Sequence, residues 1–377
     1  MNTTNIKAVA RKEYYHLIRD FRSLYLAFFI PLLLILMFGY ALSLDVDNVE
    51  TVVVDHDNTP LSRDFIQKLD ASPYFQVVQW LPDTRALGDY IDRGKAKLGI
   101  VIPAGWTRSM GSDRETPVQL ILDGSDPNYA GISRGYVTAF VEDYNAHRLV
   151  EFLDRQGLEE INTPIDARVR VWFNEDLESR LFIVPGIIAI IIMIVGALLT
   201  SLVIAREYEN GTMETIRSLP IRAQEFLVGK AIPYFLIAMM DVFIAVFMGQ
   251  ILFGVVMKSS FWLFVVASAI YLAVALTLGL LISSLTKSQQ VANQLAILIT
   301  YLPSILLSDF VFPVVNMPRI LQLITKVVPA TYFINILNGL YLRNLGIHYL
   351  WRDYAVLVVM FAFLSVLNVF FLKKEGL

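Results

Sequence analysis

A single acidic residue, Asp241, lies near the middle of an otherwise apolar run of this sequence, 231–257. An ionisable side chain at that depth is costly in hydrocarbon and is therefore a candidate functional group. It fits a translocation path on which a proton or another cation moves. It also fits a carboxyl group that is protonated or hydrogen-bonded to a neighbouring helix, and this second interpretation is the favoured one.

Motifs of the common catalytic sites are absent from the sequence. The nearest approach to a phosphate-binding loop, 88–95, has five residues between its glycines and Ala96 where Ser or Thr is needed. There is no H-E-x-x-H and no G-x-S-x-G motif. Zero cysteines exclude disulfides and thiolate sites, and four scattered histidines predict no metal site. We therefore expect no catalytic residue and no cofactor bound by this chain.

The composition is that of a polytopic membrane protein. Of 377 residues, 56% are hydrophobic and only 17% are charged, and the mean hydropathy is +0.56, which is too apolar for an ordinary soluble domain. The charges are divided unevenly, since residues 45–180 carry 24 acidic and 14 basic side chains. The remainder carries 17 basic and 10 acidic ones. This asymmetry predicts that 45–180 is translocated and that the basic loops stay inside.

Six apolar runs are long enough to be membrane spans. The first follows a basic amphipathic helix over 1–22, and we favour an uncleaved span over a signal peptide because the run is long. An even number of spans places both termini on one side, and Lys373 and Lys374 favour the cytoplasm of a bacterial inner membrane. The predicted divisions are a first span at 23–44, a five-helix transmembrane region at 181–372 and a cytoplasmic tail at 373–377. The five apolar runs of the transmembrane region are 181–205, 231–257, 261–285, 291–307 and 354–372.

Between the first two spans, 45–180 is predicted to be an external α/β domain. Runs rich in β-branched residues at 49–55, 75–80, 97–103 and 118–124 are typical of strands, and helical spacing separates them. A long helix over 129–156 and a final strand over 166–173 complete the expected domain. Near the other end of the chain, 308–351 is too interrupted to span a bilayer, so we expect an outer re-entrant loop around Asp309, Pro313, Pro318 and Pro329.

A charged segment, 206–230, joins two apolar runs and must lie on one side of a bilayer. We call it the elbow. Gly211 and Pro220 interrupt its helical pattern, which predicts a helix, a break, a short helix over 212–219 and a further helix. Any cytoplasmic loop is polar, but polarity alone does not explain an interrupted helix with two breakers. We expect the elbow to receive force from another protein.

The elbow sequence resembles the coupling region of ABC type-2 exporter permeases. The matching residues are R-E-Y-E-N-G-T-M-E at 206–214, S-L-P at 218–220, Glu225 and G-K-A-I-P at 229–233. The resemblance continues through the span junction at 279–293, the outer loop at 306–318 and VPATYF at 328–333, so it covers essentially the whole chain. GIVIP at 99–103 and LILDGSDPNYA at 120–130 resemble the subgroup with a large periplasmic domain between the first two spans. Asp309 departs from the family, which usually has a small residue there.

The resemblance implies a permease subunit that has no ATPase site of its own. A separate ATPase would bind ATP and Mg²⁺, a second permease, identical or paralogous, would complete the pore, and a periplasmic adaptor protein would assist. The implied export substrate is an amphiphile, whether a drug, a lipid or an envelope precursor. The residues that the resemblance places in or beside the coupling helix are Glu207, Gly211, Thr212, Glu214, Pro220, Glu225, Gly229 and Lys230.

Two other classes of protein remain as alternatives. A proton-coupled secondary transporter would use Asp241, although the sequence shows no inverted repeat. A periplasmic scaffold anchored by the spans is the other alternative, but six spans exceed what an anchor requires.

Overall fold

The computed structural model describes residues 2–20, 25, 28–29, 31–37, 48–110, 116–125, 127–156, 173 and 178–377. The chain divides into two compact units, one formed by Met1–Ser43 with Arg170–Leu377 and the other by Leu44–Val169. Most of the predicted first span, 23–44, lies outside the described residues. The predicted final strand, 166–173, also lies outside them except for Phe173.

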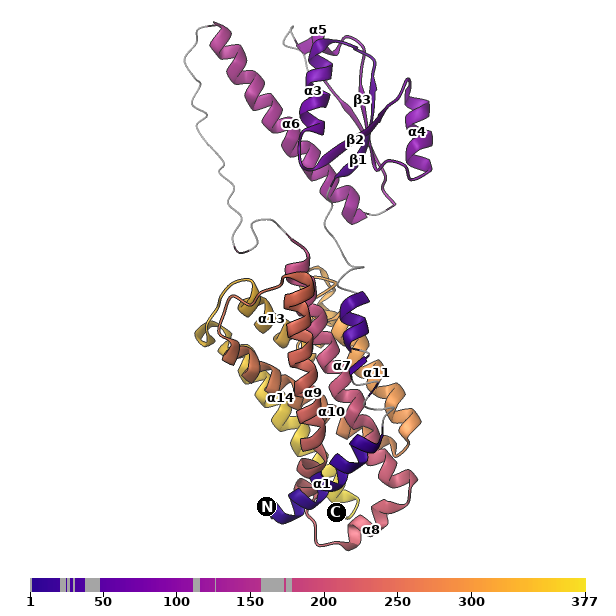
Figure 1. Ribbon diagram of the computed structural model, residues 1–377, viewed down its shortest axis with the longest axis vertical. Helices are drawn as coiled ribbons and strands as arrows, with labels where there is room; N and C mark the ends of the chain where they lie inside the picture. Colours follow the sequence, from indigo (N-terminus) through magenta and orange to yellow (C-terminus); the bar gives the residue numbers. More distant parts are fainter. Residues whose placement is uncertain are drawn as a thin grey trace. The chain divides into compact units, whose positions relative to one another are not determined.

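The unit Leu44–Val169 is a four-stranded sheet with helices on both faces (Figure 1). The strands lie in the order β2-β1-β3-β4, with β1 parallel to β2 and β3, and β3 antiparallel to β4. All four predicted strands are present, and β1 and β2 have the predicted bounds. The elements are β1 (Val49–Asp55), α3 (Pro60–Asp70), β2 (Phe75–Trp80), α4 (Thr84–Asp92), β3 (Leu98–Ile102), α5 (Trp106–Met110), β4 (Gln119–Leu122) and α6 (Pro127–Gln156).

The central strand β1 is buried because both of its faces are covered. Val49 and Val53 pack into one apolar core with α3 and α6, whereas Val52 and Val54 pack into a second core with α4. A strand covered on both sides reads as a continuous apolar run, which is why the V-V-V of this segment predicts it well. At the β3–β4 edge, Lys97 Nζ donates to Asp123 Oδ2 at 2.7 Å, and this hydrogen bond holds the pKa of Asp123 well below its ordinary value.

The other unit is a helix bundle arranged around α7. Of the described helices, four are long and apolar enough to cross a membrane, namely α7, α9, α10 and α14, and the pair α12 and α13, bent by 76°, would make a fifth if counted as one span. The predicted run 291–307 forms α11, which is not among these candidates, so six spans stay a prediction. The elements are α1 (Thr3–Arg19), α7 (Arg180–Glu209), α8 (Thr212–Ser218), α9 (Ala223–Phe253), α10 (Phe261–Thr286), α11 (Gln289–Leu306), a 3₁₀ turn η1 (Val314–Asn316), α12 (Arg319–Thr325), α13 (Pro329–Tyr341) and α14 (Ile347–Lys374).

Helices α7 and α10 pack closely because small residues lie at their contact. A side chain at Gly279 would collide with the Ala197 carbonyl and the Thr200 hydroxyl across the interface. The hydroxyl of Thr200 also donates to the Leu276 carbonyl at 2.9 Å, and Tyr271 donates to the Ala189 carbonyl at 3.1 Å. Small residues and interhelical hydrogen bonds of this kind are the usual means of packing helices in lipid.

Helices α9 and α14 begin well before the predicted runs. Helix α9 begins at Ala223 rather than 231, because the Glu225 carboxylate accepts from the Arg222 N–H at 3.3 Å and caps the helix inside the elbow. It ends at Phe253 rather than 257, because Gly254 has a φ of 65°, which ends helices. Helix α14 begins at Ile347 rather than 354, so Trp351 belongs to this helix and not to the predicted outer loop.

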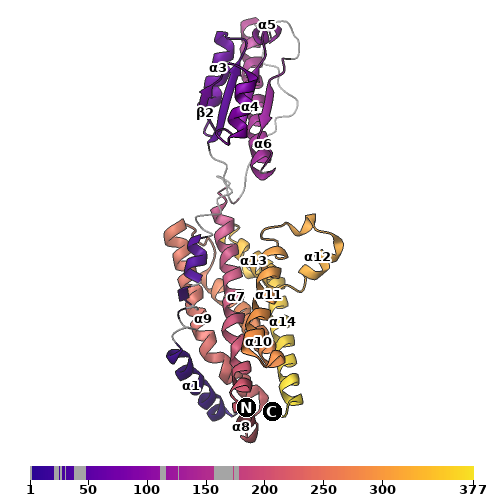
Figure 2. The same cartoon turned by 90° about the vertical axis from the view of Figure 1, so that its right-hand side faces the viewer.

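Within the bundle, α1, α8 and both chain termini lie at one end, and α12 lies at the other (Figures 1 and 2). The elbow and the basic helix α1 therefore share an end of this unit. The assignment of that end to the cytoplasm stays a prediction.

Candidate functional site

The elbow forms the predicted break between two long helices. Helix α7 ends at Glu209, Gly211 adopts a φ of 70°, and the short helix α8 follows at once. Glycine suits this position because other residues adopt a positive φ only at a cost. Pro220 is exposed in the link to α9. A chain segment that turns twice within so few residues presents α8 outside the two helices it connects.

Helix α8 has one buried face and one exposed face. Met213 and Ile216 are buried against the bundle, at 2% and 9% exposure. Thr212, Glu214 and Thr215 are exposed on the other side. An anchored helix with a free polar face can contact a second protein without losing its own packing. Of the predicted coupling residues, Glu214 is the one whose carboxylate is both exposed and on α8 itself.

Behind α8, a buried network of charges joins α1, α7 and α9. Lys230 Nζ lies 2.8 Å from Glu13 Oε2 and 2.5 Å from Glu207 Oε1, and its side chain is only 2% exposed. Glu207 Oε1 also accepts from Lys12 Nζ at 2.8 Å, and Glu13 Oε1 accepts from the Tyr234 hydroxyl at 3.1 Å. Two carboxylates thus face two ammonium groups. Buried ions are tolerated when they are paired and hydrogen-bonded in this way.

This network reaches α8 through a single hydroxyl. Thr212, the first residue of α8, donates its hydroxyl hydrogen bond to the Glu207 carboxylate. Glu207 therefore contacts α1, α8 and α9 at once. The predicted coupling residues Glu207 and Lys230 are brought together here, but they are buried within the chain and face other residues of it rather than the surface.

A second set of contacts fixes the start of α1 to the start of α9. The Glu225 carboxylate accepts from the Asn2 N–H at 2.6 Å and from Asn5 Nδ2 at 2.9 Å, while Asn5 also donates to the Pro220 carbonyl at 3.2 Å. The backbones approach closely at Gly229, where an added Cβ would lie 2.7 Å from Val9 Cβ and 3.1 Å from the Ile6 carbonyl. Helix α1 therefore packs directly on the elbow.

Replacing Gly229 with Ala is expected to lower stability by about 1–3 kcal/mol, because the new methyl group forces α1 away from α9. Thermal unfolding of the purified chain in detergent measures the effect. The matched control is Gly135→Ala in α6, where nothing lies within 4 Å of an added Cβ. That change should be neutral or stabilising, since Ala favours helix over Gly. Equal melting temperatures of the two variants would contradict the close approach of α1 to α9 at Gly229.

The far side of the elbow is tied to the C-terminus and to the α10–α11 junction. Lys287 Nζ lies 2.6 Å from Glu375 Oε1, and Arg217 Nη2 lies 3.6 Å from Glu375 Oε2. The Gln289 N–H donates to Glu209 Oε1 at 2.8 Å.

Sequence reasoning missed the contributions of Glu13, Asn2, Asn5 and Glu375. One signal was available for Glu13, which is the single acidic residue between Met1 and Arg19.

Asp241 lies apart from the buried charge network, about three helical turns beyond Lys230 on α9. It is 6% exposed, and within the described part of the chain its Oδ2 atom has no hydrogen-bond partner. The carboxyl is therefore a costly buried group that the fold of the described residues does not explain by pairing. The structure does not bring it together with the other predicted site residues.

The predicted outer loop residues form a chain of turns. Asp309 adopts a φ of 67° and accepts from the Val314 N–H at 2.7 Å. This left-handed conformation suits glycine best and is tolerated by Asp. Pro313 and Pro318 precede η1 and α12, and Pro329 begins α13. The prolines therefore lie at the ends of the short helices.

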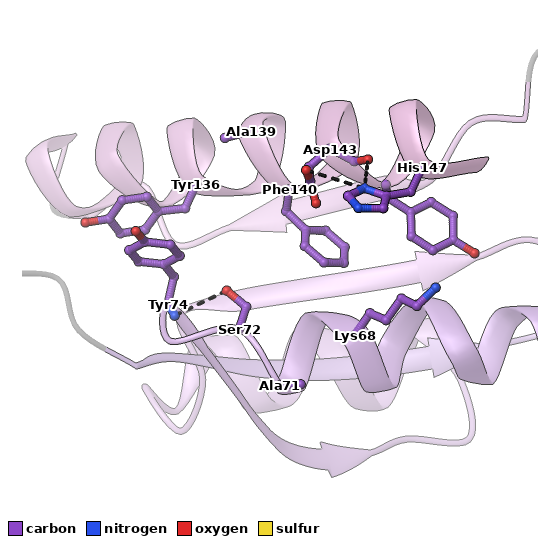
Figure 3. Close-up of a pocket in the computed structure, with 10 residues that line it drawn as sticks. Lys68, Ala71, Ser72, Tyr74, Tyr136, Ala139, Phe140, Asp143 and His147 are labelled. Atoms are coloured by element: carbon purple, nitrogen blue, oxygen red, sulfur yellow. Dashed lines mark hydrogen bonds and ion pairs between the residues drawn. The ribbon is translucent and has the colours of Figure 1, made fainter. Parts of the chain in front are cut away.

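The α/β unit has an aromatic pocket that the sequence did not reveal. It has a volume of about 490 Å³ and lies between α3 and α6 (Figure 3). Tyr74 and Tyr136 stack at one end with ring centroids 4.5 Å apart, and Phe140 and Tyr144 also line the pocket. Lys68 lies 5.4 Å from the Tyr144 ring. Such a pocket can hold a flat or apolar group of small-molecule size.

A bundle of apolar helices interrupted by an anchored polar elbow is the architecture expected of a permease in the membrane. The family comparison agrees, because the model of the ABC-2 family transporter protein matches residues 21–370. The chain belongs to this family of transporter permeases, in which the ATPase is a separate subunit.

Three relatives from Escherichia coli K12 illustrate the relationship. The chain is 35% identical over 341 residues to the probable multidrug ABC transporter permease YbhS, covering 90% of this chain and 89% of that one. It is 31% identical to the probable multidrug ABC transporter permease YbhR, covering 93% and 94%. It is 25% identical to the inner membrane transport permease YhhJ, covering 86% and 85%.

Proposed function

We propose that this permease is half of an ATP-driven exporter in a bacterial inner membrane. The observation that carries the proposal is the exposed face of α8, which is anchored on the end of the bundle that also holds both termini. A separate ATPase binds this face. A change of state must be driven by contacts that differ between the two states of the partner, and α8 offers a surface for such contacts.

The remaining architecture follows the same proposal. Six spans cross the membrane, 45–180 is periplasmic, 308–351 is the outer re-entrant loop, and both termini are cytoplasmic. A second permease, identical or paralogous, completes the path, and a periplasmic adaptor contacts the external domain. The similarity to probable multidrug permeases supports an amphiphilic substrate, such as a drug, a lipid or an envelope precursor.

Affinity purification of the chain in mild detergent tests this function. The expected result is co-elution of an ABC ATPase, together with ATP hydrolysis that depends on its presence. ATP and Mg²⁺ are then bound by the partner and not by this chain.

The rival function is proton-coupled secondary transport, and it is favoured by the buried Asp241, whose Oδ2 atom has no hydrogen-bond partner among the described residues. Recovery of the permease without an ATPase, combined with transport that follows a proton gradient and fails in Asp241→Asn, would overturn the exporter proposal.

A further inference from the structure

A charged groove lies where α1 and α7 end, beside the elbow. Its volume is about 740 Å³. The residues that line it come from α1, from the residue that follows it and from the last turn of α7: Lys12, Tyr15, His16, Arg19, Asp20 and Arg206. None of these side chains belongs to the exposed face of α8, so the groove is separate from the proposed ATPase contact.

The groove is predominantly basic. Lys12, Arg19 and Arg206 line it together with one carboxylate, Asp20. Arg206 Nη2 lies 3.4 Å from Asp20 Oδ2, and the Arg206 side chain is 18% exposed, so its guanidinium group is held in place at the groove. Among the described residues Arg19 makes no ion pair, and it is exposed. Arginine matches the geometry of phosphate oxygens, which it binds through two N–H groups.

The same helix carries an apolar and aromatic surface next to the groove. Tyr14, Tyr15 and Ile18 are exposed by 51%, 48% and 51%. An amphipathic helix with basic and aromatic residues lies in the plane of the membrane interface, at the depth of the lipid headgroups. A groove beside a helix of this kind opens at the depth where phosphate groups of lipids are concentrated.

We propose that this groove binds the phosphate group of an anionic phospholipid, with Arg19 and Arg206 as its cationic contacts and the Tyr15 hydroxyl as a further donor. Basic pockets between membrane helices are known to hold such headgroups. The groove shares Lys12 with the buried network, because Lys12 Nζ contacts Glu207 at 2.8 Å. A bound lipid thus stabilises α1 in its docked position against the elbow. The proposal does not depend on the direction of transport or on the partner ATPase.

The test is a binding titration of the purified full chain in detergent with short-chain phosphatidylglycerol, and in parallel with short-chain phosphatidylcholine. Preferential binding of phosphatidylglycerol is expected. Arg19→Gln should weaken this binding about fivefold, the effect of roughly one basic residue at a membrane surface. Arg19→Lys should lose less than Arg19→Gln, because the charge is kept although the two-point contact of arginine is lost.

The matched control is Lys7→Gln, which removes the same charge from an exposed position of α1 outside the groove. It should leave the affinity unchanged. Equal losses in Lys7→Gln and Arg19→Gln would show diffuse attraction to the whole helix and overturn the site. Equal binding of the two lipids would do the same. Displacement of phosphatidylglycerol by millimolar inorganic phosphate would show that the groove binds a soluble phosphate-bearing ligand, and this would overturn the lipid assignment.

Discussion

Replacement of Lys230 by Met is expected to destabilise the folded chain by about 3–5 kcal/mol, the usual cost of removing one partner from a buried ion pair. The ammonium group lies between Glu13 and Glu207 and is 2% exposed. Without it, two buried carboxylates are left with too few cations, and α1 loses its tie to α9. The melting temperature of the purified chain in detergent, and the yield of monodisperse protein, measure the loss.

The control for this variant is Lys12→Met, which removes a cation from the same carboxylate, Glu207. The Lys12 side chain is 51% exposed and remains in contact with water, so its removal should cost less than that of the buried Lys230. A second variant, Lys230→Met combined with Glu13→Gln, removes one of the stranded charges and should recover part of the loss. If Lys230→Met proves as mild as Lys12→Met, the buried network does not hold α1.

Glu214→Arg is expected to reduce transport and the stimulation of the partner's ATPase at least about tenfold, since reversing a charge at a contact surface costs several kcal/mol. The chain itself should fold and assemble normally. Glu214 is exposed, whereas α8 is anchored through Met213 and Ile216 on its opposite face. Transport by vesicles and ATP hydrolysis by the co-purified complex are the two measurements.

A charge reversal elsewhere serves as the control for Glu214→Arg. Asp89 is exposed on α4 in the other unit and is not part of the elbow, so Asp89→Arg reverses a charge away from the proposed contact. It should leave both activities unchanged. Unchanged transport in Glu214→Arg would contradict the assignment of α8 as the coupling helix. Loss of folded protein in that variant would show that Glu214 is needed for folding and not for a contact with the ATPase.

The features that could be predicted from the sequence are those with a local cause. Strands β1 and β2 lie at the expected residues because β-branched runs with turn residues at each end favour strands wherever they occur. The short helix was expected because Gly211 and Pro220 interrupt the helical pattern, and the structure has the break at Gly211, which adopts a left-handed backbone. Each of these depends on neighbours in the chain.

Features that depend on distant neighbours were not predicted. The amphipathic pattern of α1 showed that it has a polar face, but not that Glu13 on this helix meets Lys230 in α9. Glu207 and Lys230 were expected in or beside the coupling helix, but no local pattern indicated that both are buried, as the structure has them. Charge in a sequence indicates polarity, and only the tertiary arrangement decides whether a partner from the same chain neutralises it.

The buried network also constrains the order in which the chain can assemble during synthesis. Lys230 and Glu207 are separated by 23 positions and can pair as soon as α9 emerges, whereas Lys12 and Glu207 are 195 positions apart. Until then Glu13 has no buried cation to meet, so the first helix to be made must wait in the aqueous interface, because a lone carboxylate is expensive to bury. Protease accessibility of α1 in nascent chains stalled before Ala223 would reveal this wait, and protection at that stage would refute it. The first helix of the chain thus docks only after α9 has been made.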